Sequence, residues 1–245
     1  FRPFVEQKLS MGFAAVDGSG HDFTGVNIRS VDEQTGQGRT GLKASSLVSI
    51  NGLLYMWMRN ADGNGRECRL AWSTDRAVTW TWADWTIPEL GYCVFINYGK
   101  DYAGARDQYV YSVSHNNPSA YRPASDFVLM RVPVEAITER DTYEFLTAVD
   151  AENQPAWDAN IEMRGSVFHH ESRALRSGIT YSPALSRYLW WQQIPDPGSD
   201  PPDTRYSGGF GIYDAPEPWG PWTTAYFTDT WDVGPGETGM FPTKW

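Results

Sequence analysis

The sequence has little cysteine, little histidine and no long hydrophobic run. Its two cysteines, Cys68 and Cys93, exclude a fold held by several disulfides, and their spacing fits either one bond or two free thiols. No apolar run is long enough to cross a bilayer, so no membrane partner is expected. The densest histidine signal is His169 beside His170, but neighbours on a strand point to opposite faces. No metal site is therefore predicted.

Positive charge is also scarce. Lys and Arg number 20 against 30 Asp and Glu, which gives a net charge of −10 at pH 7. This charge repels phosphate backbones, so no nucleic-acid partner is expected. Aromatic residues are plentiful instead, with 12 Trp, 13 Tyr and 11 Phe in a chain of one-domain size. Most of these rings belong in a core, and one or two are expected to stack on sugar rings.

Helical periodicity is weak, and residues 133–145 predict a turn or two at most. Short apolar runs between Gly, Pro, Asn and Asp clusters dominate. The clearest are the two runs in 45–58, where Asn51 and Gly52 predict a hairpin because both residues tolerate positive φ. Similar pairs recur at 92–114 and 177–194, and 239–245 resembles the first strand of another pair.

Strand pairs that repeat at roughly 50–70 residues predict an all-β, five-bladed β-propeller of four-stranded antiparallel blades. A β-sandwich is the alternative. The units are a partial blade at 1–41, blades at about 42–88, 89–158 and 159–230, and the start of a last blade at 231–245. Because open sheet edges are a liability, the missing strands at both ends favour an internal part of a longer polypeptide.

Two short motifs carry a resemblance to known propellers. "STDRAVTW" (73–80) resembles the Asp box of sialidase-type propellers, with Ala77 where glycine is usual. "YDAPEPWGPW" (213–222) resembles an outer-strand turn of arabinanase and β-fructosidase propellers. We place the octet in a turn between outer strands, where Asp75 caps backbone N–H groups and Trp80 packs inward.

Longer stretches resemble a mostly uncharacterised bacterial domain-of-unknown-function family near the endo-arabinanases. These stretches are 41–60, 131–146, 155–168 and 178–191. The resemblance implies a five-bladed propeller that cleaves glycosidic bonds with two or three carboxylates around a central funnel. One of these carboxylates lies on the first blade's inner strand, which would precede Phe1 here. It also implies an oligo- or polysaccharide partner, a monomer, and a secreted or periplasmic location. No cofactor is expected, and no acidic spacing points to a structural Ca²⁺.

The mouth of such a funnel is built by segments that lead into inner strands and by links between second and third strands. Glycoside hydrolysis needs a carboxylic acid and a second carboxylate on opposite sides of the bond. The densest charged segment, 160–176, supplies Glu162 and Glu171, and the neighbouring blade supplies Asp62 or Glu67. The alternative is that these groups are solvated loop charges paired with adjacent arginines.

Sugar-binding residues are expected in the same segments. The predicted set is Arg39, Lys43, Arg59, Tyr92, His115, Arg164, His169 and Arg176. Its arginines suit an anionic sugar, because guanidinium binds carboxylate in a fork. Tyr92, Tyr121 and Tyr206 are candidates for stacking.

Two other functions stay open at this point. One is a non-catalytic propeller that binds carbohydrate or protein. The other is a polysaccharide lyase, in which Tyr92 or His169 serves as base and Arg164 neutralises a uronate. A funnel lined by Tyr, His and Arg would favour the lyase.

Overall fold

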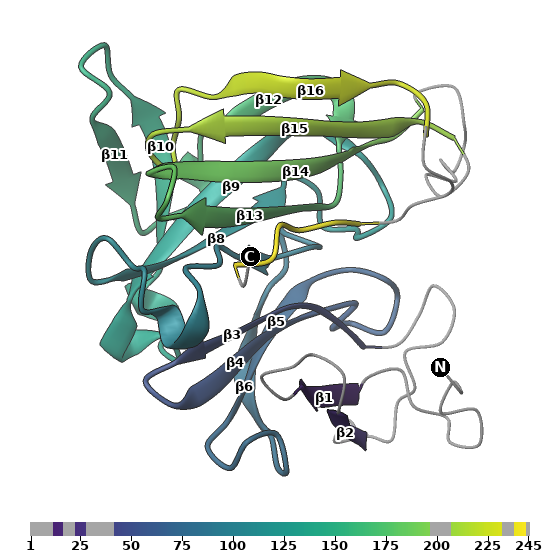
Figure 1. The fold of residues 1–245 in the computed structure, drawn as a ribbon, viewed down its shortest axis with the longest axis vertical. Helices are drawn as coiled ribbons and strands as arrows, with labels where there is room; N and C mark the ends of the chain where they lie inside the picture. The colour runs from purple at the N-terminus through teal and green to yellow at the C-terminus, as the bar shows by residue number, and fades with distance from the viewer. Residues whose placement is uncertain (1–11, 17–22, 28–41, 197–206, 232–237, 244–245) are drawn as a thin grey trace.

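The computed structural model describes residues 12–16, 23–27, 42–196, 207–231 and 238–243, and these form an all-β propeller (Figure 1). One four-stranded sheet holds β3 (Lys43–Ile50), β4 (Leu53–Arg59), β5 (Cys68–Ser73) and β6 (Thr81–Ile87) in sequence order. A second holds β13 (Ser177–Ser182), β14 (Arg187–Ile194), β15 (Gly209–Ala215) and β16 (Thr223–Thr228). Both have the up-and-down antiparallel order predicted for blades. The hairpin predicted at Asn51 and Gly52 is confirmed, with φ of 52° and 79°.

The third sheet lies between these two along the chain. It contains β7 (Val94–Phe95), β8 (Tyr109–His115), β9 (Ala124–Pro133), β10 (Glu144–Val149), β11 (Pro155–Asp158) and β12 (Phe168–Ala174). Short 3-10 turns, Val134–Ala136 and Arg140–Thr142, stand where the sequence predicted a turn or two of helix. Further 3-10 turns cover Lys100–Tyr102 and Ile161–Met163, and β1 (Gly12–Val16) pairs with β2 (Phe23–Asn27). No helix of the described residues is long and apolar enough to span a membrane.

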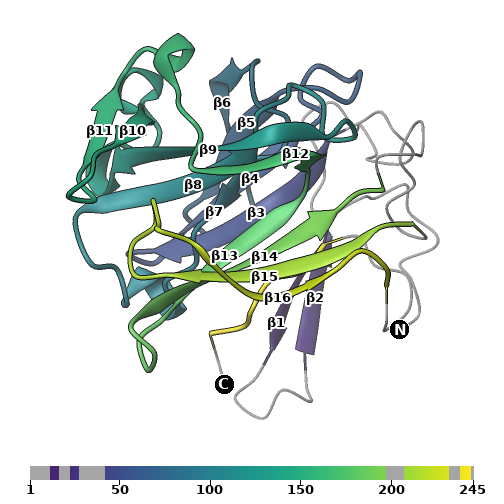
Figure 2. The same ribbon diagram turned by 90° about the horizontal axis from the view of Figure 1, so that it is seen from above.

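The first strands of the three sheets lie side by side around a common axis (Figure 2). Asn97, just after β7, exchanges backbone hydrogen bonds of 2.9 Å with the strand β13. On the other side of β13, Thr180 Oγ1 donates a hydrogen bond of 2.7 Å to the Phe241 carbonyl. The segment 239–243 therefore follows β13 around the axis, where the sequence predicted the first strand of a further unit.

The core joins neighbouring blades through large rings. Trp57 of β4 is fully buried and packs against Trp85, Phe95 and Tyr143, with ring centroids 5.6–6.1 Å apart. Its indole N–H donates to Ser112 Oγ at 3.0 Å. Because Ser112 lies on β8, this ring cluster holds the β3–β6 sheet (the first blade) against the sheet that contains β8 (the second blade).

The outer strand of the second blade is split in two. At one end of β9, Phe145 of β10 lies opposite Met130; at the other end, Phe168 of β12 lies opposite Phe127. The backbone groups along the edge of β9 need partners, and two separate stretches of chain supply them. Residues 168–174 are thus an edge strand and not, as the sequence suggested, part of the segment that leads into the next inner strand.

The "STDRAVTW" turn has the predicted structural role. Asp75 Oδ1 accepts hydrogen bonds of 2.8 Å from the Thr79 N–H and from Ser73 Oγ, and Oδ2 accepts one of 2.6 Å from Thr79 Oγ1. The bonds from Thr79 and Ser73 lower the pKa of Asp75. Ala77 adopts φ of 71°, the left-handed conformation that glycine takes most easily. The octet closes the turn between β5 and β6.

The link between β7 and β8 lies at the end of the axis where the inner strands end. It holds neighbouring blades together there. Asp101 accepts hydrogen bonds from Ser49 Oγ at 2.9 Å and from the Gly52 N–H at 2.8 Å. Arg106 forms an ion pair of 2.8 Å with Glu217 of the third described blade. These contacts give residues 100–107 a structural role.

The two cysteines are free thiols. Both are buried, and the Cys93 N–H donates to Cys68 Sγ at 2.9 Å. Burial raises the pKa of Cys93 well above its usual value. Of the two alternatives that the sequence left open, the structure has the unbonded one.

Candidate functional site

The functional candidates gather where inner strands begin and second strands end. In an antiparallel pair these two ends lie side by side. Lys43, at the start of β3, is opposite Arg59 at the end of β4. Ser177, at the start of β13, is opposite Gln192 near the end of β14. Segments from all three blades therefore meet at one end of the axis, which we call the mouth.

Five side chains at the mouth form what we call the cation–tyrosine cluster. Its members are Lys43, Arg59, Tyr92, Tyr121 and Arg176. The Arg59 guanidinium lies 5.3 Å from the Tyr92 ring centre and 5.4 Å from that of Tyr121. For Arg176 the corresponding distances are 5.7 and 5.5 Å. Each arginine thus contacts both rings at cation–π distance.

Tyr121 is the polar centre of this cluster. Its hydroxyl oxygen accepts a hydrogen bond of 3.2 Å from Lys43 Nζ and one of 3.0 Å from Asn60 Nδ2. Partial burial raises the pKa of Tyr121, but the Asn60 bond and the charges of Arg59 and Lys43 outweigh it, so the net shift is downward. The cluster therefore stabilises negative charge at its centre.

The two arginines of the cluster are buried, whereas Lys43 and Tyr121 are partly accessible. Arg59 is 9% exposed and Arg176 is 4% exposed, while Lys43 and Tyr121 are half-buried. Charges removed from water are screened less than surface charges. The accessible edge of the cluster is thus formed by the ammonium group and the phenol.

Behind the cluster lies a layer of buried polar groups. His115 is fully buried, and its Nε2 lies 2.9 Å from the Ser119 carbonyl oxygen, which assigns the donor role to that nitrogen. Burial lowers the pKa of His115 to about 4, and the Arg176 charge contributes to this, so the ring is neutral at pH 7. His115 therefore acts here as a packed hydrogen-bond donor.

Gln192 belongs to the same buried layer. It is fully buried, and within the described part of the chain neither its amide oxygen nor its amide nitrogen has a hydrogen-bond partner. A buried polar atom without a partner costs about 1–3 kcal/mol. At such a position a ligand or a water molecule commonly supplies the missing hydrogen bond.

The two carboxylates first predicted as catalytic lie at the surface. The side chains of Glu162 and Glu171 are 71% and 79% exposed. Glu162 lies 3.9 Å from Arg164 Nη1, and Glu171 lies 3.6 Å from His169 Nε2. These contacts fit the solvated-charge alternative, and the structure does not join either carboxylate to the cation–tyrosine cluster.

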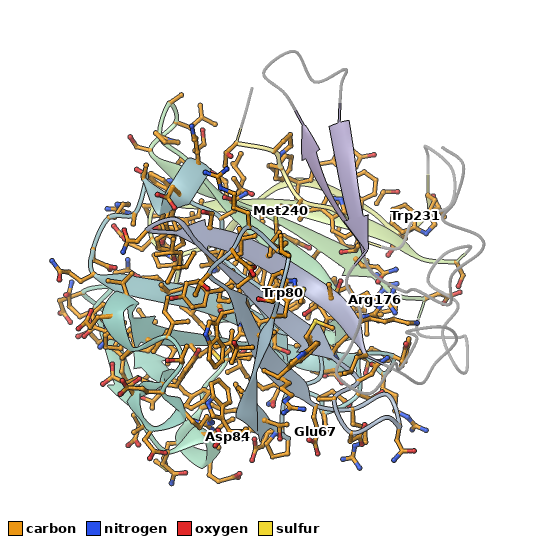
Figure 3. The ribbon with its side chains drawn as sticks, turned by 90° about the horizontal axis from the view of Figure 1, so that it is seen from below. Glu67, Trp80, Asp84, Arg176, Trp231 and Met240 are labelled. Atoms are coloured by element: carbon orange, nitrogen blue, oxygen red, sulfur yellow. The ribbon has the colours of Figure 1, made fainter. Side chains whose placement is uncertain are left out.

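The carboxylates of the neighbouring blade also have structural contacts. Asp62 is exposed and caps its own turn, accepting hydrogen bonds from the N–H groups of Asn64 and Arg66 at 2.8 and 3.0 Å. Glu67 is half-buried with φ of 69°, and its N–H donates to the Pro118 carbonyl at 3.0 Å. Figure 3 shows Glu67 apart from Arg176. A catalytic role for these four carboxylates stays a prediction.

The remaining predicted binding residues separate from the cluster. Arg164 donates to Asn116 Oδ1 at 2.9 Å and fastens the turn Ile161–Met163 to the end of β8. His169 is exposed on β12 and bonds Asp126 at 2.8 Å, which raises its pKa. Arg39 and the stacking candidate Tyr206 lie outside the described residues. Of the eight predicted residues, the structure brings together Lys43, Arg59, Tyr92 and Arg176, with His115 behind them.

No cofactor site emerges from these contacts. In the described ranges, no three His, Cys, Asp or Glu side chains are grouped to hold a metal ion. Among the described residues, the side chains that meet in the cluster and the layer behind it are cations, phenols, amides and a neutral imidazole.

Comparison with known proteins supports the fold. No protein-family model matches the chain, and no curated protein matches its sequence. Among solved structures, the RS223 β-xylosidase superposes with a TM-score of 0.51 at 13% identity, over 90% of this chain and 67% of that one. Two others superpose less closely. They are the GH43_1 enzyme from Xanthomonas citri complexed with xylose (TM-score 0.42, 13% identity, 75% and 54%) and the subtype N11 neuraminidase-like protein of A/flat-faced bat/Peru/033/2010 (0.38, 15%, 93% and 59%).

These similarities reach only part of each known protein. The chain spans between about half and two thirds of the length of these structures. At 13% identity, the likeness to the β-xylosidase shows a shared propeller fold and nothing about chemistry. Function has to be argued from the mouth itself.

Proposed function

We propose that the chain is a carbohydrate-active propeller that binds an oligo- or polysaccharide at the cation–tyrosine cluster, and that the bound sugar carries a carboxylate. The observation that carries this proposal is the meeting of Lys43, Arg59 and Arg176 around two tyrosines at the mouth. The Lys43 ammonium group at the accessible edge can pair with a carboxylate, the buried guanidinium groups add positive charge behind it, and tyrosine rings offer an apolar face with a polar tip. A uronic acid presents both a carboxylate and an apolar ring face.

The charge of the whole chain limits where an acidic sugar can bind. The net charge of −10 opposes binding of a polyanion at long range, so the local positive charge of Lys43, Arg59 and Arg176 has to outweigh it. Polysaccharides of this kind lie outside the cytoplasm, and we therefore propose a secreted or periplasmic location.

Of the enzymatic alternatives, the lyase fits the mouth best. A lyase needs a base beside cations that neutralise a uronate, and the cluster holds a phenol between two guanidinium groups and an ammonium group. Hydrolysis by paired carboxylates is the second candidate. It is supported by the fold shared with a β-xylosidase and by the resemblance to arabinanase-like propellers, with Glu162, Glu171, Asp62 and Glu67 as the residues to test.

Binding is tested by isothermal titration calorimetry with acidic and neutral oligosaccharides of equal length. We expect tighter binding of uronate oligomers than of xylo- or arabino-oligomers. Arg59→Gln and Arg176→Gln should each weaken uronate binding by about 10-fold to 100-fold, the range of a hydrogen bond between charged groups. Circular dichroism verifies that each variant is folded.

A matched control is Arg131→Gln. Arg131 also stacks on a tyrosine, with its guanidinium 4.1 Å from the Tyr109 ring centre, but Tyr109 begins β8 at the end of the strand away from the mouth. This variant should bind like the original chain. Equal affinity for neutral and acidic sugars, or unchanged binding in both mouth variants, would refute the proposed site.

A further inference from the structure

We propose that Tyr121 is a catalytic base, which removes the C5 proton of a bound uronate so that the glycosidic bond at C4 breaks by β-elimination. This inference rests on the proposed function and deepens it by assigning the reaction and the reacting atom. Tyr121 comes from the link between β8 and β9, and its partners Lys43 and Asn60 come from the neighbouring blade. Arg176 approaches from the third described blade. Three blades thus fix the position of one hydroxyl group.

The surroundings of Tyr121 suit a phenolate. Two donors, Lys43 Nζ and Asn60 Nδ2, point at the phenol oxygen from 3.2 and 3.0 Å. The guanidinium groups of Arg59 and Arg176 lie 5.4 and 5.5 Å from its ring centre. Hydrogen bonds and opposite charges favour the ionised form of an acid. These contacts are in accord with the lowered pKa of the phenol.

The same cations prepare the substrate. A C–H bond beside a carboxylate is a weak acid, because the carbanion would place a second negative charge next to the first. Lys43 at the accessible edge pairs with the carboxylate, and the buried charges of Arg59 and Arg176 behind it stabilise the developing negative charge, which makes removal of the adjacent proton easier. The same cations therefore make the C5 proton of the substrate more acidic and increase the fraction of Tyr121 that is ionised.

The reaction balances in atoms and electrons without a co-reactant. The Tyr121 phenolate takes the C5 proton, and the electron pair of that C–H bond becomes the C4–C5 double bond. The C4–O bond breaks, and the departing oxygen takes a proton back from the Tyr121 phenol. The products are an unsaturated uronate and a chain with a free hydroxyl group, no water is consumed, and Tyr121 is again a phenolate.

Other bases at the mouth are less suited. Tyr92 is 5% exposed and packs beneath both arginines. His115 is fully buried, and its low basicity and its bond to the Ser119 carbonyl leave it neutral and fixed. Tyr121 is half-buried, so its hydroxyl combines partial access with stabilising partners.

The test uses the full chain with three uronate polymers, polygalacturonate, alginate and hyaluronate. Formation of the C4–C5 double bond is followed by ultraviolet absorbance, and total cleavage by reducing ends. We expect equal amounts of both on at least one polymer. Tyr121→Phe should lower kcat by about 100-fold to 10,000-fold, the usual range for loss of a general base, with little change in KM. The original chain should show a kcat/KM that rises with pH and levels off below the ordinary phenol pKa.

The matched control is Tyr109→Phe, which removes a phenol hydroxyl at the other end of the same blade and should keep full activity. Calorimetric binding of a uronate trimer to Tyr121→Phe shows that this variant is folded. If the chain binds uronate oligomers but forms no double bond on any of the three polymers, elimination is refuted while the proposed binding function stands. Reducing ends without double bonds would mean hydrolysis, and a fully active Tyr121→Phe would also overturn the assignment. Absence of uronate binding would refute the proposed function itself.

Discussion

The buried histidine at the mouth makes stability depend on pH. The pKa of His115 falls from 6.5 to about 4 in the folded chain, because the ring is fully buried beside Arg176. Protonating this ring therefore costs the folded state about 3 kcal/mol more than the unfolded chain. The unfolded chain takes up the proton as the pH falls through 6.5, while the folded ring stays neutral until about 4. The contribution of the neutral ring to the free energy of unfolding is complete above pH 6.5 and is lost progressively as the pH falls to about 4.

At pH 5 the loss attributable to His115 is about 2 kcal/mol relative to pH 8. The perturbation is His115→Gln, since a glutamine amide can still donate to the Ser119 carbonyl but does not titrate. Urea unfolding at pH 8 and pH 5, followed by tryptophan fluorescence, gives the two free energies of unfolding for each chain. The variant should lose about 2 kcal/mol less than the original chain on acidification. Equal losses in the two chains would refute the reasoning, because His115 would then not be neutral and buried.

Three further predictions concern packing. Trp57→Phe should lower the free energy of unfolding by about 1–3 kcal/mol in urea melts, because it leaves a void and removes the donor to Ser112; a change under 0.5 kcal/mol contradicts this. Gly165→Ala should destabilise by roughly 1–3 kcal/mol, because the new Cβ would collide with the Thr147 carbonyl, and an unchanged melt would disprove the close approach. Both thiols, Cys68 and Cys93, should resist Ellman's reagent in the folded chain and react in urea, whereas rapid labelling of the native chain would show that they are exposed.

Much of the fold could be predicted from the sequence because hairpins are local. The Asn51–Gly52 turn, the strand pair at 177–194 and the Asp75 turn all depend on residues close in the chain, and each has the predicted form. The split outer strand was missed for the opposite reason. Residues 169–173 are all polar and carry no strand signal of their own. They are extended because β9, about 40 residues earlier, offers a free edge.

The site was predicted in part. The topology of a propeller placed Lys43, Arg59, Tyr92 and Arg176 at the mouth, and the structure brings them together. The hydroxyl of Tyr121 could not be singled out, since its partners Lys43 and Asn60 lie 78 and 61 residues away. Charge density along the sequence directed attention to 160–176 instead, where charged groups gather because an edge strand faces water.

The divided outer strand also gives the chain a site, the turn between β10 and β11, where the polypeptide could be cut. The turn at 150–154 is closed by its own hydrogen bonds, in which Asp150 Oδ1 accepts from the N–H groups of Glu152 and Gln154. A cut in this turn would leave β10 on β9 in one fragment, while β11 and β12 of the other fragment pair with the same sheet. We expect two polypeptides divided there to reassemble, since the strand pairs and the core across the cut are complementary. The same turn would accept an inserted domain, because β10 before it and β12 after it each pair with β9.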